Sequence, residues 1–347
     1  MNHSWQVPVQ KKIMEWKGNL EGFFRALGER GRRGEACFFV INYELTEAML
    51  FGLDTEEESE RELAFAFPER TYHNDVPAGH LRPHLGHIEK HPESLDRYAL
   101  RFGRVMKAMQ EEGLELINLT LATPITLHQT LEEIYLSTNA RYKVLVRGRF
   151  VCFSPERFIH ISKEGYITSH PMKGTISRVI PHAEEVILND PKEQREHHIM
   201  VESMKEELAK VGSNVAVPRY RYITEVDNED GGLLQVSSEV CAELGNNWPS
   251  RMGEILQKLL PAGSITGVPK EIACRVIKES EQRERGFYSG IAGYFDGSTL
   301  ETSVLIRFIE ERSDGSKYFH SGGGVTSDSL CEREYAEVLA KIYLPNA

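Results

Sequence analysis

Two pairs of glutamates recur at a spacing suited to holding a cation. Glu193 and Glu196 stand three residues apart in the segment 190–211, and Glu334 and Glu337 repeat that spacing near the end of the chain. On a helix, residues three apart project from the same face. Mg²⁺ prefers carboxylate oxygens, so two such helices facing each other could bind the ion between them. Each pair alone also fits a simpler explanation, because glutamates near a helix start complement the helix dipole.

A lysine inside a tight turn is the second feature with chemical potential. Residues 170–178 read His-Pro-Met-Lys-Gly-Thr-Ile-Ser-Arg. Pro171 fixes one backbone dihedral and Gly174 frees another, so Lys173 can present its amine to a ligand in one orientation, beside the hydroxyl of Thr175. An ordinary Pro/Gly turn with a solvated lysine also fits this stretch.

Groups suited to acid catalysis and to anion binding lie before and after this lysine. Glu156 lies between two predicted strands, where burial would raise its pKa and make it a general acid, although a solvated hairpin-loop glutamate is the alternative. Residues 261–270 form a loop of glycine and hydroxyl-bearing residues that runs into a helix, and helix N-termini attract anions. Residues 321–325 contain three consecutive glycines, which allow a ligand to approach the backbone closely.

The composition indicates a soluble, globular protein and argues against two classes of partner. The chain has 347 residues, of which 40% are hydrophobic and 27% charged, with a formal net charge of −11. Nucleic-acid affinity depends on basic surface, and a membrane span needs about 18 apolar residues in a row. We therefore expect no nucleic acid and no membrane as partners. Any anionic substrate must be captured by local cations, backbone N–H groups or a metal ion. Five cysteines without a CxxC pair favour a reducing, cytoplasmic location.

The order of predicted elements favours an α+β fold over alternating strands and helices. Apolar periodicity predicts helices at 13–30, 95–112, 129–137, 190–211 and 269–281, and a last helix that begins at Asp328/Ser329. Strands are predicted at 37–44, 48–53, 114–121, 142–147, 150–154, 158–162, 233–241, 286–295 and 302–310. Because strands dominate between 140 and 170, the sheets should be antiparallel or mixed rather than those of a Rossmann fold.

Taken in order, the motifs resemble those of the chorismate-binding enzymes. The likeness is dense from about 150 to 345. It includes Ser-x-Glu-x-Phe (154–158), Pro-Ile-x-Gly-Thr with Met172 for Ile (171–175), Glu-x-x-Glu-His (193–197), Gly-Ser-Ile-Thr-Gly-Ala-Pro-Lys with Val268 for Ala (263–270), Tyr-x-Gly-x-x-Gly-Tyr (288–294), Thr-x-x-x-Ile-Arg (302–307), Gly-x-Gly (322–324) and Glu-Tyr-x-Glu-x-x-x-Lys (334–341). Any one motif is weak, whereas the ordered series is highly specific.

The resemblance implies a fold and a division of the chain. The fold expected is α+β, with two antiparallel β-sheets packed face to face and helices outside. Residues 1–90 would be a reduced N-terminal portion that completes one sheet. Residues 91–347 would form the chorismate-binding catalytic core, as part of one compact unit.

The residue at position 173 distinguishes members of this family. Lysine there is typical of aminodeoxychorismate synthase component I, whereas anthranilate synthases usually have alanine. The resemblance then implies Mg²⁺-dependent amination of chorismate at C4, giving 4-amino-4-deoxychorismate for 4-aminobenzoate and folate synthesis. Lys173 would add to C2 as a transient nucleophile, and Glu156 would protonate the departing C4 hydroxyl.

The same resemblance assigns the remaining site residues. Mg²⁺ would be bound by Glu193, Glu196, Glu334 and Glu337. The substrate would be bound by Gly174, Thr175, Tyr288, Arg307, Gly322, Gly324 and Lys341.

The resemblance also leaves alternatives open. The chain has no Cys-His-Glu amidotransferase module, so we expect ammonia from a separate glutamine amidotransferase subunit. An anthranilate synthase component I is the first alternative. A catalytically inactive chorismate-binding subunit is the second, because Leu234 replaces a histidine usual near the substrate and residues 202–207 depart from the family pattern. Isochorismate and salicylate synthases have a water-activating lysine where this chain has Leu116, so activation of water is not expected.

Overall fold

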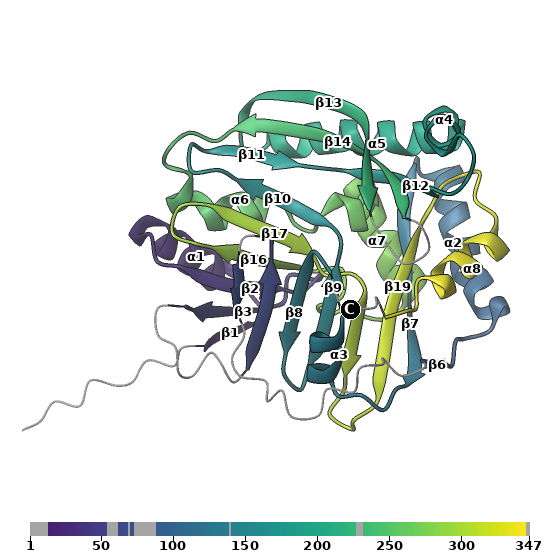
Figure 1. The fold of residues 1–347 in the computed structure, drawn as a ribbon, viewed down its shortest axis with the longest axis horizontal. Helices are drawn as coiled ribbons and strands as arrows, with labels where there is room; N and C mark the ends of the chain where they lie inside the picture. Colours follow the sequence, from purple (N-terminus) through teal and green to yellow (C-terminus); the bar gives the residue numbers. More distant parts are fainter. Residues whose placement is uncertain are drawn as a thin grey trace, which may run out of the picture.

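Two antiparallel β-sheets packed face to face form the body of the protein, and helices lie outside them (Figure 1). The computed structural model describes residues 13–53, 62–68, 70–72, 88–138, 140–226 and 232–344. Every pairing between described strands is antiparallel. The α+β architecture predicted from the sequence is confirmed.

The first sheet contains ten described strands. In spatial order they are β1 (Ile13–Lys17), β3 (Glu47–Gly52), β2 (Cys37–Ile41), β16 (Ile291–Phe295), β17 (Leu300–Val304), β10 (Arg157–Ile161), β11 (Tyr166–Ser169), β14 (Leu233–Glu243) and β12 (Met172–Ser177), with β13 (Ser213–Val226) also paired to β14. The strand that carries Lys173, β12, therefore lies at the end of this order.

The second sheet contains nine described strands. In spatial order they are β15 (Gly267–Val268), β7 (Leu116–Thr126), β19 (Lys317–Val325), β18 (Phe308–Glu311), β9 (Phe150–Ser154), β8 (Tyr142–Val146), β4 (Leu63–Phe67) and β5 (Arg70–Tyr72), with β6 (Glu89–Lys90) also paired to β7. The N-terminal part thus adds strands to both sheets, whereas we expected it to complete one. β1, β2 and β3 join the first sheet and β4 and β5 the second, so the two sheets share this part of the chain.

Eight α-helices are described. They are α1 (Glu21–Arg33), α2 (Leu95–Glu111), α3 (Leu131–Ser137), α4 (Ala183–Asn189), α5 (Pro191–Ala209), α6 (Met252–Leu259), α7 (Lys270–Glu281) and α8 (Cys331–Ala340). None of the described helices is long and apolar enough to span a membrane.

The core follows from the alternation of side chains along buried strands. On β2, Phe38 points between the sheets, where its ring stacks on Phe65 of β4 with centroids 4.2 Å apart. Its neighbour Phe39 points the other way, toward Phe23 of α1, with centroids 6.1 Å apart. Because successive strand residues face opposite sides, one apolar run fills two layers of the core.

Three predicted elements differ from those observed. Residues 13–17 form strand β1 rather than the start of a helix, because they pair with β3. The predicted strand 302–310 is two strands in different sheets, separated by Arg307 with a φ of 53°. The last helix begins after Leu330, without a side-chain cap, rather than at Asp328 or Ser329.

Candidate active site

Two of the segments that connect the sheets are short and lie side by side. Residues 155–156 link β9 of the second sheet to β10 of the first, and residues 305–307 link β17 of the first to β18 of the second. The Val304 amide donates to the Glu156 carbonyl (3.2 Å), and the Arg307 carbonyl accepts from an amide of β9 (3.1 Å). These backbone hydrogen bonds fix the predicted acid and the predicted carboxylate-binding arginine in one place.

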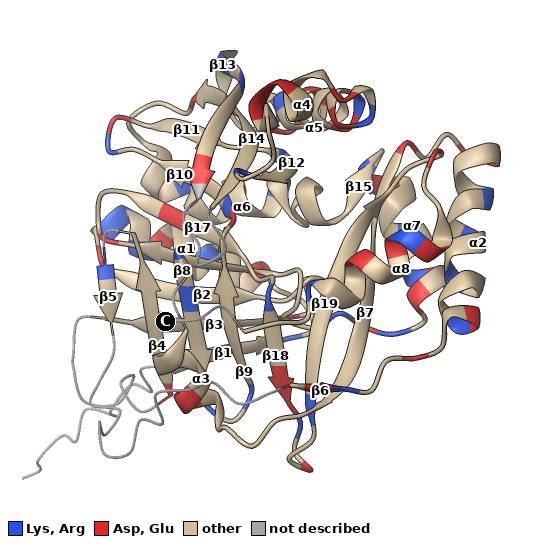
Figure 2. Cartoon of the chain, turned by 45° about the vertical axis from the view of Figure 1, so that its right-hand side comes forward, with Lys and Arg blue, Asp and Glu red and all other residues tan. Residues whose placement is uncertain are grey.

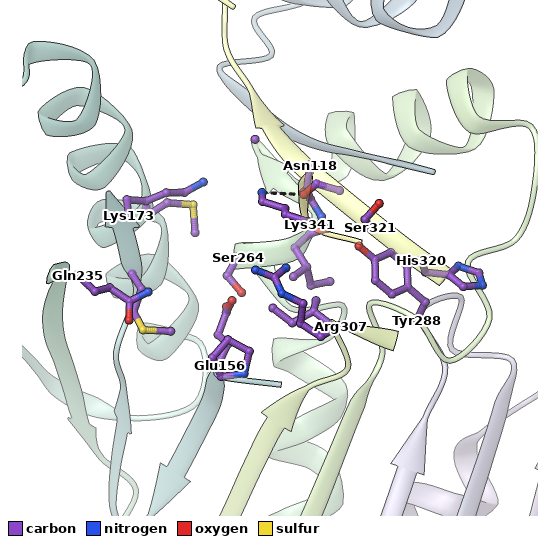
Figure 3. Close-up of a pocket in the computed structure, with 17 residues that line it drawn as sticks. Asn118, Glu156, Lys173, Gln235, Ser264, Tyr288, Arg307, His320, Ser321 and Lys341 are labelled. Atoms are coloured by element: carbon purple, nitrogen blue, oxygen red, sulfur yellow. Dashed lines mark hydrogen bonds between the residues drawn. The ribbon is translucent and has the colours of Figure 1, made fainter. Parts of the chain in front are cut away.

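A cavity of about 210 Å³ lies next to the two links (Figure 3). The predicted residues that line it are Glu156, Lys173, Tyr288, Arg307, Gly322, Gly324 and Lys341. They come from both sheets, from the links and from the end of α8, so distant sequence motifs meet at one site.

The charges around the cavity favour an anion. Lys173, Arg307 and Lys341 provide three cations, and Glu156 is the carboxylate that faces them. In Figure 3, Lys173 lies on one side, Lys341 on the other, and Glu156 and Arg307 point in from the sheet links. A local excess of positive charge in a chain of net charge −11 raises the local concentration of an anionic ligand.

Two predicted substrate-binding residues do not line the cavity. Thr175 is exposed on β12, and its backbone pairs with Gln235 of β14. Gly174 has a φ of 90° and lies against Glu193, one of the predicted metal ligands. A Cβ at position 174 would lie 3.2 Å from Glu193 Oε2. Gly174 therefore lets the backbone turn beneath α5 just after Lys173.

The amine of Lys173 reaches the cavity and is only loosely paired. Its Nζ lies 3.8 Å from Glu196 Oε2, and the side chain is 19% exposed. Gly324 of β19 makes room for it, because a Cβ at Gly324 would lie 2.9 Å from that Nζ. The glycine loop thus determines where the predicted nucleophile can lie.

The carboxyl of Glu156 has the properties of a general acid. Burial raises its pKa above the ordinary value, more strongly than the Ser264 hydrogen bond and the charges of Lys173, Arg307 and Lys341 lower it. Ser264 belongs to the 3₁₀ turn 263–265 and lies beside Glu156 in Figure 3. A carboxyl that holds its proton to higher pH can protonate a leaving group.

Burial and hydrogen bonds fix the protonation of Tyr288 and the position of Lys341 at the far side of the cavity. Burial raises the pKa of Tyr288 to about 12, so its hydroxyl remains a hydrogen-bond donor. The Tyr288 ring adjoins that of His320, with centroids 5.1 Å apart. Lys341 Nζ donates to the Gly322 carbonyl (2.9 Å) and to Glu337 Oε1 (2.7 Å). The Lys341 ammonium therefore joins the glycine loop of β19 to α8.

The four predicted metal-binding glutamates gather between α5 and α8. Asp190 caps α5 as predicted, and its side chain accepts from the Lys192 and Glu193 amides at 2.8 and 3.0 Å. Lys192 Nζ lies 3.7 Å from Glu196 Oε1 on α5 and 3.7 Å from Glu334 Oε1 on α8. Figure 2 shows acidic residues on both helices among interspersed basic ones.

Strand β19 lies against both the cavity and this cluster, and a Cβ at Gly324 would lie 2.9 Å from Lys173 Nζ and 3.9 Å from Glu196 Oε2. Gly322 and Gly324 line the cavity, whereas a Cβ at Gly323 would lie 3.6 Å from Glu334 Oε2 and 3.7 Å from Glu337 Oε1. The alternation of strand side chains therefore gives the glycine triplet two functional faces.

The acidic neighbours oppose the effect of burial on the pKa of Lys192 and add to the effect of burial on the pKa of Glu193. Burial alone would lower the pKa of Lys192, but the charges of Glu196, Glu334, Glu193 and Glu337 outweigh it and raise that pKa. The pKa of Glu193 is raised, first by burial and then by its acidic neighbours. The set of carboxylates thus attracts a cation strongly.

The donor chemistry of the cluster fits Mg²⁺, which binds carboxylate oxygens. Among the described residues, no three His, Cys, Asp or Glu side chains converge closely enough to hold a metal ion. Lys192 Nζ nevertheless lies 3.7 Å from both Glu196 and Glu334, and the charges of Glu193 and Glu337 also raise its pKa. These four glutamates are the residues that would hold Mg²⁺.

A buried network behind the cavity supports its wall. The Arg285 guanidinium is fully buried and donates to both oxygens of Glu281, at 2.6 and 3.1 Å. It also donates to the carbonyls of Ile265 (2.8 Å) and Asn118 (2.6 Å). Because Ile265 and Asn118 line the cavity, this pair locks β7 to the turn that carries Ser264.

Sequence analysis missed several polar residues of the site. Asn118, Gln235, Ser264 and His320 line the cavity; all but His320 lie in segments compared with family motifs, but none was predicted as a site residue. Gln235 lines the cavity and the neighbouring Leu234 does not, so a histidine at position 234 would not line it either. The alternation of β14 places Gln235 and Leu234 on opposite faces of the sheet, and Gln235 is on the cavity side.

Comparison with known proteins gives a consistent family. The family described as chorismate binding enzyme matches residues 29–345. A Haemophilus influenzae protein named "Uncharacterized PabA-like protein" is 38% identical over 329 residues, which cover 95% of this chain and 98% of that protein. Aminodeoxychorismate synthase component 1 of Salmonella typhimurium is 30% identical over 226 residues, 62% of this chain and 45% of that protein.

Solved structures share the fold at low sequence identity. The menaquinone-specific isochorismate synthase of Escherichia coli has a TM-score of 0.71 at 17% identity, over 94% of this chain and 82% of that one. Anthranilate synthase component I of Streptococcus pneumoniae has a TM-score of 0.71 at 15% identity, over 99% of this chain and 94% of that one. These likenesses concern the fold alone.

Proposed function

We propose, since the chain belongs to the chorismate-binding enzyme family, that it is an aminodeoxychorismate synthase component I. It would aminate chorismate at C4 with ammonia and release 4-amino-4-deoxychorismate. The observation that carries this proposal is the Lys173 amine, which reaches the cavity and, among the described residues, has its ion-pair partner in Glu196 at 3.8 Å. An amine so placed supports a nucleophilic role better than a purely structural one.

The reaction would proceed in two displacements. Lys173 Nζ adds to C2 of the ring, both ring double bonds shift by one position toward C4, and the C4 hydroxyl leaves as water with the proton of Glu156. Ammonia then attacks C4, both double bonds shift back, and the C2–N bond to Lys173 breaks. The proton lost by the incoming ammonia returns to the Glu156 carboxylate. The raised pKa of Glu156, caused chiefly by burial, supports its part in this exchange.

Binding of the substrate would use the other charged groups of the cavity. Arg307 and Lys341 would pair with the two carboxylates of chorismate, and Tyr288 would donate a hydrogen bond. Mg²⁺ on Glu193, Glu196, Glu334 and Glu337 would neutralise the ring carboxylate when bound. The gathering of these glutamates around Lys192 supports their assignment.

Ammonia would come from a separate glutamine amidotransferase. A glutaminase cysteine must be a reactive thiolate with a lowered pKa. Burial is instead the main cause of raised pKa values at Cys152, Cys241, Cys274 and Cys331. These thiols are thus poorly suited to hydrolyse glutamine, which supports a partner.

The test is product analysis with the purified full chain, chorismate, Mg²⁺ and an ammonium salt. We expect 4-amino-4-deoxychorismate with ammonium and no turnover with glutamine alone. Anthranilate with pyruvate would identify an anthranilate synthase instead, and no product would identify an inactive chorismate-binding subunit. Glutamine-dependent turnover by the pure chain would contradict the proposed partner.

A further inference from the structure

The carboxylate cluster between α5 and α8 already contains a cation of the protein's own. Lys192 Nζ is 3.7 Å from Glu196 Oε1 and 3.7 Å from Glu334 Oε1. These two glutamates are the most buried of the four, at 7% and 3% exposure. One ammonium therefore links the two helices through residues that would also bind the metal.

This link is held by charge rather than by close hydrogen bonds. Both distances exceed the roughly 2.7–2.9 Å of a charge-assisted hydrogen bond, and the Lys192 side chain is 44% exposed. Lys192 is the second residue of α5, after Pro191. Its flexible stem starts at the helix end and can turn into solvent.

A divalent cation and this ammonium compete for the same oxygens. Mg²⁺ binds oxygen at about 2.0–2.1 Å and demands a nearly octahedral arrangement. A metal ion held by Glu196 and Glu334 would lie close to the ammonium, where like charges repel each other in a poorly solvated site. One of the two cations must leave.

We propose that Lys192 is an internal counter-ion of the metal site, which holds α5 to α8 in the metal-free protein and must be displaced for a divalent cation to bind. The inference rests on the proposed function, which supplies the divalent ion. It makes Lys192 a determinant of metal affinity rather than a catalytic residue. The metal-free helices keep their positions because one charge always remains between them.

The test measures metal binding directly, with Mn²⁺ as the probe and the full chain without chorismate. Lys192→Met keeps the apolar stem and removes the charge. In this variant the ion pairs of Lys192 with Glu196 and Glu334 no longer compete with Mn²⁺ for the carboxylate oxygens. Because both pairs are partly exposed, we expect Mn²⁺ to bind about ten-fold more tightly. The metal-free variant should melt below wild type, because four carboxylates then lack this cation, and saturation with Mn²⁺ should remove the difference.

Two further variants control for charge. Lys192→Arg keeps the cation and should bind Mn²⁺ as weakly as wild type. Lys205→Met removes a lysine from the same helix, one paired with Glu202 at 2.8 Å, and should leave Mn²⁺ affinity unchanged. A gain in Lys205→Met equal to that in Lys192→Met would indicate a general effect of net charge and would overturn the inference.

Unchanged Mn²⁺ affinity in Lys192→Met would also overturn it, as would no Mn²⁺ binding by either wild type or variant. Neither result decides the proposed function, because product formation from chorismate and ammonia is measured separately. A wild type that binds Mn²⁺ but forms no amino product would in turn leave the counter-ion inference standing.

Discussion

Two sets of buried carboxylates in this molecule are paired with cations in opposite ways. Behind the cavity, Glu281 and Arg285 are both fully buried and share two hydrogen bonds of 2.6 and 3.1 Å. Between α5 and α8, Glu196 and Glu334 share the Lys192 ammonium at 3.7 Å. The first set is closed by a planar fork that matches a carboxylate, and the second is neutralised by a mobile point charge.

This difference distinguishes an ion pair that stabilises the fold from a set of carboxylates that can exchange one cation for another. Burial alone would raise the pKa of Glu281, but the charges of Arg285 and Arg283 hold that pKa below its ordinary value. The Arg285 donors are used on Glu281, Ile265 and Asn118, so this pair has little to offer a ligand. The carboxylates around Lys192 keep lone pairs that a metal ion can take. A buried ion pair alone therefore does not distinguish a structural from a ligand-binding role, whereas the distance between its charged groups helps to do so.

Loss of the loosely held amine in the cavity should have the largest effect. Lys173→Ala is expected to lower amination at low ammonia by roughly three decades or more, because the covalent route is lost. Its melting temperature should stay near that of wild type, since Lys173 is paired only at 3.8 Å. Product formation and calorimetry measure the two effects.

Lys341→Ala is the matched comparison for this variant. A lost charge-assisted hydrogen bond costs about 1.5–3 kcal/mol, or one to two decades. Near-normal turnover of Lys173→Ala, with no adduct on its peptide in wild-type enzyme incubated with chorismate alone, would reduce Lys173 to a binding residue.

Breaking the closed pair should instead cost stability. Arg285→Met leaves Glu281 buried without its main partner, and we expect a loss of about 3–5 kcal/mol in the free energy of unfolding. Urea denaturation measures this loss. The double variant Arg285→Met/Glu281→Gln should recover part of it. If Arg285→Met unfolds no more easily than Lys192→Met, the distinction between the two sets fails.

Removing a carboxylate from the exchangeable set should affect activity more than stability. Glu196→Gln and Glu337→Gln are each expected to lose most Mg²⁺-dependent amination, because a ligand is lost, while the free energy of unfolding changes by about 1 kcal/mol or less. Activity is measured against Mg²⁺ concentration. Full activity of both variants in the presence of a chelator would rule out the metal assignment.

The smallest effect is expected from Ser264, which lies in the turn held by Arg285 and hydrogen-bonds to Glu156. Burial raises the pKa of Glu156, and the Ser264 hydrogen bond is the first of the influences that lower it. A general acid works while protonated, so turnover falls as pH rises through this pKa. Ser264→Ala should raise that pKa further and move the descending limb of the kcat–pH profile to higher pH. A limb that persists unchanged in Glu156→Gln belongs to another group.

Local sequence patterns were sufficient where an element depends on its own residues. The helix predicted at 190–211 appears as α5, with Asp190 as its cap. The strands predicted at 37–44 and 48–53 appear as β2 and β3. In each case the capping residue or the apolar run is sufficient to predict the element from its own sequence.

Patterns failed where distant partners decide the structure. Residues 13–17 have helical apolar spacing, but pairing with β3 makes them a strand. The long strand β13 was not predicted, because its many polar residues give no apolar run and its pairing with β14 shifts register three times. Arg307 breaks the predicted strand 302–310 with a left-handed backbone, which nothing in its own sequence requires.

The same division holds for the site. Ordered motifs predicted Lys173, Glu156 and the four glutamates, and the structure brings these residues together around β12, α5 and α8. Lys192 and Arg285 were missed because a lysine near a helix start or an arginine after a helix usually faces solvent. Only the fold brings Glu334 close to Lys192 and the Asn118 carbonyl close to Arg285.

The two side-by-side links between the sheets hold the acid and the arginine differently from the lysine. Glu156 and Arg307 lie on those links, and their backbone carbonyls accept hydrogen bonds from one strand of each sheet. Lys173 lies on β12, which ends the strand order of the first sheet and has no strand beyond it within the described chain. The spacing between Glu156 and Arg307 therefore depends on both sheets, whereas the position of Lys173 depends on one terminal strand.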